Sequence, residues 1–376
     1  MGKRIYIKNV LINSCCEFWG DILSIILTLL ILCIIVILHE WGHFIVAKKS
    51  GVLVEEFAVG MGPKLFSVKR GETMYSLRLI PIGGYCKMAD EVEEGSQKLG
   101  FNQVSLPKRI AISFAGPFMN FVLAFLVFVF ITMCTGYSTV NVTSVIENTP
   151  AYNAGIKPGD KIINYAGHNI HTRDEMEYYK AKYADDYVSV VVKRNGEKIN
   201  TELAAQKTEK GYSLGLQLDY KAPLINVMDY NGENITKGSV LSYFSQGYWG
   251  LVSMVKIMVL SFADLFTGSV AVSELSGPIG VTTAVGSVYQ EAARVSIWAV
   301  VLSMLNMVAL LSVNLGIINL FPLPALDGGR IIIYIVELFV GRELPKSVEA
   351  MIHAIGFVLI MGLGVIIAFN DILKLV

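Results

Sequence analysis

An apolar stretch that runs directly into a cluster of ionisable residues constrains this chain more than any other feature. Residues 22–38 contain no charged side chain, and residues 39–43 read His-Glu-Trp-Gly-His. About 20 apolar residues are enough for a helix to cross a bilayer, so the segment predicts a membrane span with charged groups in its last third. Ionisable groups inside a span are costly and mark functional sites.

The spacing of the two histidines predicts a metal site. On a helix, His39 and His43 lie one turn apart on one face, so both imidazoles can bind one metal ion. Glu40 lies beside them, where its carboxylate can take a proton from a water at the metal. Such short patterns also occur by chance, but three ionisable groups within five residues of a span are hard to explain as packing.

Composition places the chain among integral membrane proteins with some water-soluble mass. Of its 376 residues, 53% are hydrophobic and only 16% are charged. The net charge of zero argues against a nucleic-acid partner. The five cysteines form no CxxC pair, so we expect neither a disulfide framework nor cysteine ligands. We expect no cleavable signal peptide, because cleavage would remove the metal-binding helix.

Four segments have the length and apolarity of membrane spans: residues 22–46, 110–134, 295–321 and 350–369. A fifth candidate, residues 250–262, is short and interrupted by Lys256, and we interpret it as part of an amphipathic helix over residues 239–266 that lies along the membrane surface. The loop between the first two spans, residues 48–109, carries ten Lys and Arg residues, which places it in the cytosol by the positive-inside rule. The metal motif then lies towards the cytosolic side of the bilayer.

Residues 52–88 of that loop have strand character. Apolar and polar residues alternate around Gly and Pro, which predicts hairpins. The segment 76–88 is apolar enough to enter the membrane, where a strand edge beside the metal can hold an extended substrate by main-chain hydrogen bonds. A peripheral hairpin packed on lipid head groups is the alternative, because periodicity alone cannot place a strand.

Asp327 is the best candidate for a third ligand. Catalytic zinc needs three protein ligands and an open position. His353 lies at the start of the fourth span, but Asp327 follows two helix-breaking prolines in a Gly-flanked turn, where a bare carboxylate is costly unless it is paired or coordinating. It can meet His39 and His43 only if residues 239–266 do not cross the membrane. A solvated Asp in an ordinary interfacial turn is the alternative.

Residues 138–221 predict a compact soluble domain of short strands and one helix. A Pro-Gly-Asp turn and an Asn-Gly hairpin signal separate its strands. The run 149–162 resembles a PDZ domain, a module that binds chain ends by strand addition. His168 and His171 in this domain are expected to be exposed loop histidines, since no partner is spaced for a metal.

Together these motifs resemble the site-2 protease family of intramembrane zinc metalloproteases, in the form of the bacterial regulator of sigma-E protease with one PDZ domain. The motifs are HExxH at 39–43, NxxPxPxxDG at 319–328, Gly-Gly-Tyr at 83–85 and Ser-Gly-Pro-Ile-Gly at 276–280. The resemblance covers nearly the whole chain from residue 22. It implies a hydrolase that acts in regulated intramembrane proteolysis, cutting peptide bonds within or near transmembrane segments.

The resemblance also implies roles for single residues. Zn²⁺ is expected on His39, His43 and Asp327, with Glu40 as general base and then general acid. Substrate contacts are expected from the broken helix after the third span and from a membrane-reentrant β-loop at 76–88, through Asn319, Pro322, Pro324, Gly83, Gly84 and Tyr85.

The expected fold is an α-helical integral membrane protein with four transmembrane helices, a membrane-associated β-hairpin region and an inserted α+β PDZ domain. Its expected parts are an N-terminal tail (1–21), the first two spans with the zinc motif and β-loop (22–137), the PDZ domain (138–221), a surface helix and linker (222–294), and the last two spans with the third ligand (295–376).

The expected location is the bacterial cytoplasmic membrane, with the PDZ domain outside and the active site towards the cytosol. Expected partners are membrane lipids and transmembrane substrates already trimmed by a site-1 protease, such as anti-sigma factors or signal-peptide remnants. Two alternatives are a membrane-tethered zinc peptidase that cuts at the surface and a non-catalytic PDZ scaffold with a structural metal.

Overall fold

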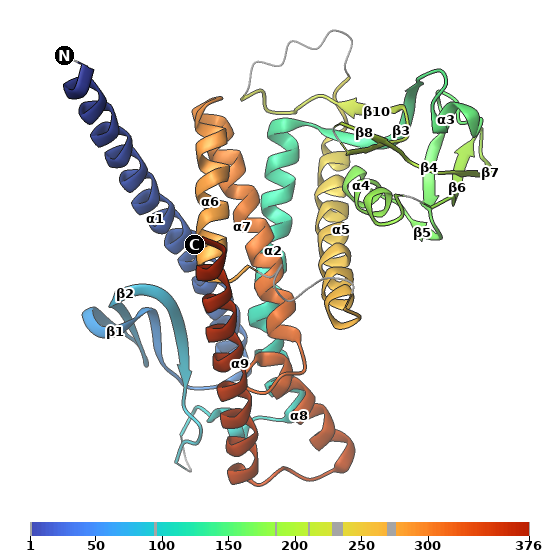
Figure 1. Cartoon of the computed structure of the whole chain (residues 1–376). Coiled ribbons are helices and arrows are strands. Elements are labelled where there is room, and N and C mark those ends of the chain that lie inside the picture. The colour runs from blue at the N-terminus through green and yellow to red at the C-terminus, as the bar shows by residue number, and fades with distance from the viewer. Residues whose placement is uncertain are drawn as a thin grey trace. The chain divides into compact units, whose positions relative to one another are not determined.

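A computed structural model describes residues 2–93, 96–184, 186–209, 211–227, 236–268 and 276–375 (Figure 1). The side chains of residues 2–19 lie outside this description, and with them the basic residues of the N-terminal tail and Cys15 and Cys16. The chain divides into two compact units, residues 1–124 with 263–376, and residues 125–262. Helix α2 (Leu106–Thr135) runs from the first unit into the second.

The first unit is mainly helical, and its elements are α1 (Gly2–Ser50), β1 (Val54–Arg70), β2 (Thr73–Met88), a 3-10 turn (Phe101–Gln103), the first part of α2, α6 (Pro278–Ala293), α7 (Ile297–Leu320), α8 (Asp327–Val340) and α9 (Lys346–Leu375). The sequence predicts one helix and a linker for residues 222–294, and the structure adds α6 there. Pro278 at its first turn suits a helix start, and Val285 is fully buried among Ile31, Met307 and Val308.

Among the described residues, five helices are long and apolar enough to cross a membrane. Four of them, α1, α2, α7 and α9, correspond to the four predicted spans, and the fifth is α5 (Val240–Phe266). In α9, large apolar side chains such as Phe357 and Val358 are exposed, at 58% and 68%. A helix that exposes such a surface needs an apolar solvent, so the protein is a multi-pass membrane protein.

The second unit contains a small α+β domain, whose elements are β3 (Tyr137–Val145), α3 (Pro150–Asn153), β4 (Lys161–Tyr165), β5 (His168–Asn169), α4 (Arg173–Lys182), β6 (Val188–Arg194), β7 (Glu197–Leu203), β8 (Gln206–Thr208), β9 (Gly211–Ser213) and β10 (Leu216–Lys221). The main sheet has the order β10-β3-β4-β6-β7, with β5 beside β4. The predicted Asn-Gly hairpin is confirmed, because Asn195 and Gly196 join β6 to β7, and both have positive φ.

Helix α5 is attached to this domain by polar contacts. Lys256 donates to Glu175 (3.2 Å), a residue of α4 that is 1% exposed, and Ser253 bonds Thr172 (2.9 Å). The charge that interrupts the apolar run is therefore a partner of the soluble domain. The charge of Lys256 is therefore weak evidence that α5 lies along the membrane surface, because Lys256 is paired with Glu175 whether or not α5 lies there.

The two histidines of the domain are stacked on aromatic rings. His171 is exposed as predicted and lies on Trp249, with ring centroids 3.7 Å apart. The prediction of exposure is wrong for His168, which is half-buried against Tyr179 at 4.2 Å. Its short strand β5 turns the ring onto α4, a contact that loop composition does not reveal.

The predicted hairpin region forms a folded-back sheet. Residues 56–59 of β1 pair on one side with 84–87 and on the other with 74–77. The segment 84–88 is therefore an outer edge among the described strands. This edge packs against α1, and it places β-strand main chain beside the helix that carries the HExxH motif.

Candidate metal centre

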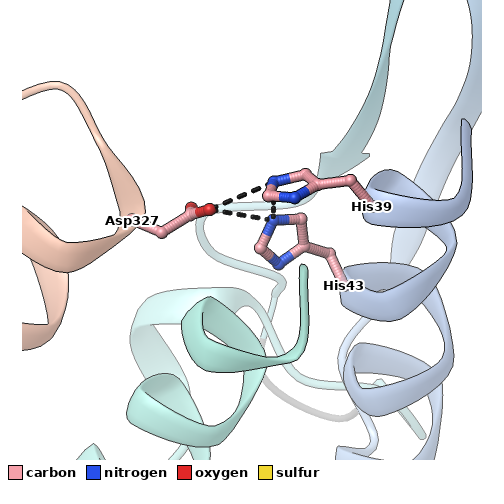
Figure 2. A group of neighbouring side chains, drawn as sticks. All are labelled: His39, His43 and Asp327. Atoms are coloured by element: carbon pink, nitrogen blue, oxygen red, sulfur yellow. Dashed lines mark hydrogen bonds and ion pairs between the residues drawn. The ribbon is translucent and has the colours of Figure 1, made fainter. Parts of the chain in front are cut away.

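Helix α1 presents His39 and His43 on one face, as the spacing predicts. Both are 7% exposed, and their Nε2 atoms are 3.2 Å apart (Figure 2). Asp327, the first residue of α8, points its carboxylate at the same place. Its Oδ2 lies 3.1 Å from His39 Nε2 and 3.4 Å from His43 Nε2.

These three donors fit a zinc ion. Tetrahedral ligands at about 2.0–2.1 Å from zinc lie about 3.3 Å from one another, which matches the three separations. Among the described residues, this is the group of three His, Cys, Asp or Glu side chains whose ligand atoms converge. The hypothesis of a merely solvated Asp327 is therefore not needed.

A tight turn brings Asp327 to the centre. Gly328 and Gly329 lie where any Cβ would overlap main-chain atoms of Leu320, Phe321 and Leu323. The chain after α7 can therefore fold back on itself only with glycine at both positions. The Gly-Gly pair after the aspartate thus has a steric reason, and the aspartate becomes the start of a new helix.

Hydrogen bonds to the other ring nitrogens orient the histidines. His43 Nδ1 lies 2.8 Å from the carbonyl of Ile112, so Nδ1 carries the proton and Nε2 keeps a lone pair for a metal. His39 Nδ1 lies 3.2 Å from the amide of Asn120, which is fully buried. The Asn120 Oδ1 has no other partner among the described groups, and it can accept from His39 Nδ1–H when the amide is turned.

Sequence reasoning missed two residues of α2. Asn120 is a polar residue inside an apolar span, and that cost was the signal that could have revealed it. Gly116, one turn earlier, faces the ligands: a Cβ there would lie 2.7 Å from His39 Nε2 and nearer still to His43 Nε2. The glycine leaves the room that the two imidazoles occupy.

We expect Asn120→Ala to weaken zinc binding by about 10–100-fold, because it removes the partner that orients His39. Asn120→Asp should retain most of the affinity, since a carboxylate oxygen also accepts from Nδ1–H. Competition with a chelator in detergent measures both. Equal zinc affinity in wild type and Asn120→Ala would show that this hydrogen bond does not orient the ligand.

Glu40 lines a cavity of about 310 Å³ together with the three donors. Its Oε2 accepts the backbone N–H of Cys86, in the outer strand edge, at 3.0 Å. The carboxylate is thereby held beside the donors, on the side of the cavity where β2 runs. Asn319, Cys86 and Met88 also line this cavity.

The other residues implied by the resemblance lie at different places relative to Glu40 and the cavity. Gly84 lies near Glu40, because a Cβ there would be 3.8 Å from Glu40 Cγ and 2.8 Å from the carbonyl of Ala58. Gly83 adopts a positive φ of 77°, Pro322 is exposed in the turn after α7, and Pro324 is half-buried in that turn. Tyr85 does not line the cavity, and its hydroxyl accepts from Arg78.

Glu56 ties the hairpin sheet together. Its Oε1 accepts from Ser76 Oγ (2.5 Å), Arg78 (2.9 Å) and Lys64 (3.3 Å). Burial raises the pKa of Glu56, but the hydrogen bonds from Ser76 and Arg78 outweigh it and lower this pKa to about 2. The carboxylate therefore stabilises the sheet above the ordinary glutamate pKa of about 4.3, and this contribution is lost as the pH falls towards 2.

We expect Glu56→Gln to lower hydrogen-exchange protection of β1 and β2 at pH 7, because charge-assisted bonds of about 1.5–3 kcal/mol are weakened. Wild type should lose protection below about pH 4, after correction for the intrinsic exchange rate, while the variant should not. Glu55→Gln, on an exposed neighbour paired with Lys87 at 2.7 Å, is the control. Unchanged protection in Glu56→Gln at pH 7 would contradict the expectation.

Two histidines and one aspartate around an open cavity, with a glutamate next to the first histidine, match the ligand types and the neighbouring base of a catalytic zinc site in a metalloprotease. Residues 27–363 match peptidase family M50, to which the site-2 proteases belong, and the chain is a member of that family.

Relatives support the same class. A provisionally named zinc metalloprotease of Clostridium perfringens is 34% identical, over 93% of this chain and 98% of its own. Others from Clostridium acetobutylicum and Fusobacterium nucleatum are 31% and 32% identical, over 93% and 94% of this chain and 97% and 99% of theirs.

A solved PDZ domain of an SdrC-like protein from Listeria monocytogenes is 24% identical, covers 22% of this chain and 88% of its own, and has a TM-score of 0.20.

Proposed function

We propose that this metalloprotease cleaves peptide bonds within or near transmembrane segments of other membrane proteins. The observation that carries the proposal is the place of the donors: His39 and His43 belong to a candidate membrane span of 29 residues and are buried there, with the half-buried Asp327 beside them. A peptide bond that reaches them must enter the apolar layer.

The strand edge beside Glu40 supports an unwound substrate. Cys86 is paired with Phe57, yet its N–H points away from that partner to Glu40. Alternate residues of an edge strand direct main-chain donors and acceptors outwards, so the outward groups of residues 84–88 other than the Cys86 N–H can pair with an added strand next to the cavity. Such pairing satisfies the backbone groups that a substrate helix exposes when it unwinds in the membrane.

The chain's own residues then divide the chemistry. The chemistry that zinc supplies when bound is polarisation of the scissile carbonyl and a water whose pKa is near 7. Glu40 accepts the proton of the attacking water and passes it to the leaving amine, which contributes about 10²–10⁴-fold. Asn319, at the end of α7 and in the cavity wall, is placed to bond the substrate backbone.

The PDZ-like domain is proposed to select substrates outside the cytosol. Strand β10 pairs with β3 only, among the described strands, and its free edge faces α4 across a cavity of about 320 Å³. Arg173 and Met176 from α4 and Leu216–Leu218 from β10 line it. An extended chain end can add to this edge, so a substrate trimmed by a site-1 protease fits better than one with a large folded domain.

The proposed location is the bacterial cytoplasmic membrane, with the centre towards the cytosol, the PDZ-like domain outside and α5 along the membrane surface. The ten basic residues of the loop 48–109 support this orientation. The convergence of Asp327 with His39 and His43 supports the surface position of α5, since an additional crossing before α7 would reverse the side on which α7 ends.

A single-span model substrate in liposomes tests the proposal. Wild type should cut within the apolar segment, as mass mapping of the fragments would show, and a zinc chelator should abolish the cuts. Cuts confined to residues outside that segment would support a membrane-tethered peptidase instead.

Deletion of residues 138–221 tests the role of the PDZ-like domain. The deletion should also carry Lys256→Met, because Lys256 would otherwise lose Glu175 in an apolar helix. Substrates with bulky external domains should be cut by the deletion variant and spared by wild type. If both enzymes spare them, the domain does not act as a size filter.

A further inference from the structure

The turn that carries Asp327 is held from outside by α9. The backbone N–H of Ala325, two residues before the ligand, donates to Nδ1 of His353 at 2.9 Å. His353 lies near the start of α9, a helix that is long and apolar enough to cross a membrane, and its chain neighbours Ile352 and Ala354 are apolar. His353 is not one of the converging metal donors, which are His39, His43 and Asp327, so its hydrogen bond to the turn is the contact to explain.

Ala325 needs such support. Its φ is 77°, in the left-handed region that an alanine rarely adopts. Backbone in this region persists only where the surroundings hold it. The bond from His353 is the contact that holds the Ala325 N–H, so it helps to maintain the conformation that aims Asp327 at the histidines.

Gly356 provides a second contact of the same kind. It lies one turn after His353 on α9 and is buried against the same turn. A Cβ on Gly356 would lie 2.6 Å from the carbonyl carbon of Pro324 and would also overlap the proline ring. The turn thus packs against α9 at two residues, Gly356, which leaves room for Pro324, and His353, which accepts the hydrogen bond from Ala325. We call this pair of residues the notch.

We propose that His353 and Gly356 are positioning residues for the metal centre. Their contacts hold the Pro324–Ala325 turn against α9, and the position of this turn determines the position of the Asp327 carboxylate relative to His39 and His43. The side chains of α9 around the notch are mostly exposed, as at Met351 (57%) and Ile355 (54%), so the notch is a principal contact between α9 and the ligand turn. The inference rests on the proposed metal site.

Zinc affinity and the visible spectrum of the Co²⁺-substituted protein provide the test, because neither depends on turnover. His353→Leu removes the acceptor and should weaken zinc binding about tenfold or more, with a changed Co²⁺ spectrum, since a carboxylate ligand is displaced. His353→Asn should behave almost as wild type, because Asn Oδ1 hangs on Cγ as His Nδ1 does and can accept from Ala325. Glu349→Gln controls for the other neighbour of His353, at 3.8 Å.

Gly356→Ala should also weaken zinc binding, while its matched control Gly362→Ala, on the same helix with open space around it, should not. If His353→Leu does not fold, His353→Asn and the two glycine variants still decide. Wild-type affinity in both His353→Leu and Gly356→Ala would overturn the proposal. Equal loss in His353→Asn and His353→Leu would overturn the hydrogen-bond role.

The test separates this inference from the proposed function. If wild type binds no zinc at His39, His43 and Asp327, the metal site itself is wrong and the notch has nothing to position. If wild type binds zinc and cleaves substrate, and the α9 variants match it in affinity and spectrum, only the role of His353 and Gly356 fails.

Discussion

Glu40→Gln should reduce peptide cleavage by about 10²–10⁴-fold while zinc content stays unchanged. The glutamine keeps an oxygen that can accept the Cys86 N–H, which now lies 3.0 Å from Glu40 Oε2, so the local geometry is retained. What it lacks is a basic oxygen to take a proton from water. The measurement is the initial rate on the model substrate, together with zinc per polypeptide.

Glu55→Gln makes the same chemical change at an exposed position of the hairpin sheet and should leave the rate unchanged. A Glu40→Gln enzyme that keeps its zinc and still cuts within tenfold of wild type would exclude Glu40 as the general base. It would also exclude the proposed mechanism, because that mechanism uses no other base.

Gly116→Ala should abolish the metal centre with a single methyl group. The added Cβ would lie 2.7 Å from His39 Nε2 and would overlap His43 Nε2. The overlap with His43 alone forces one imidazole or the whole of α2 to move, and a displacement of about 1 Å near the chemistry costs on the order of 10²-fold in rate. Zinc affinity should fall with it, since both ligands of α1 are affected.

Gly362→Ala is again the matched control, because nothing lies within 4 Å of its added Cβ. On helix propensity alone, both changes should stabilise their helices by up to about 1 kcal/mol. A loss of zinc that occurs in Gly116→Ala but not in Gly362→Ala therefore cannot come from a change in helix stability. Full zinc occupancy and wild-type cleavage in Gly116→Ala would mean that the histidines do not occupy the positions described above.

The sequence predicted that His39 and His43 share one helix face with Glu40 beside them, and it predicted the apolar segments that form α1, α2, α7 and α9. The sequence did not predict that Lys256, the charge in the apolar run of α5, pairs with the buried Glu175. It also did not predict α6, whose apolar residues pack against α1 and α7. In both places the partner is remote in the chain, so local composition describes the residue without its contact.

What the sequence by itself determined follows from spacing along one element. Two histidines four residues apart share a helix face in any fold, and an apolar run of this length requires a membrane whatever packs beside it. The convergence of Asp327 with them, the support from Asn120, the room left by Gly116 and the contact with His353 were decided by the tertiary structure alone. These depend on distances between α1, α2, α8 and α9, and such distances are set by the packing of whole helices, which no local pattern encodes.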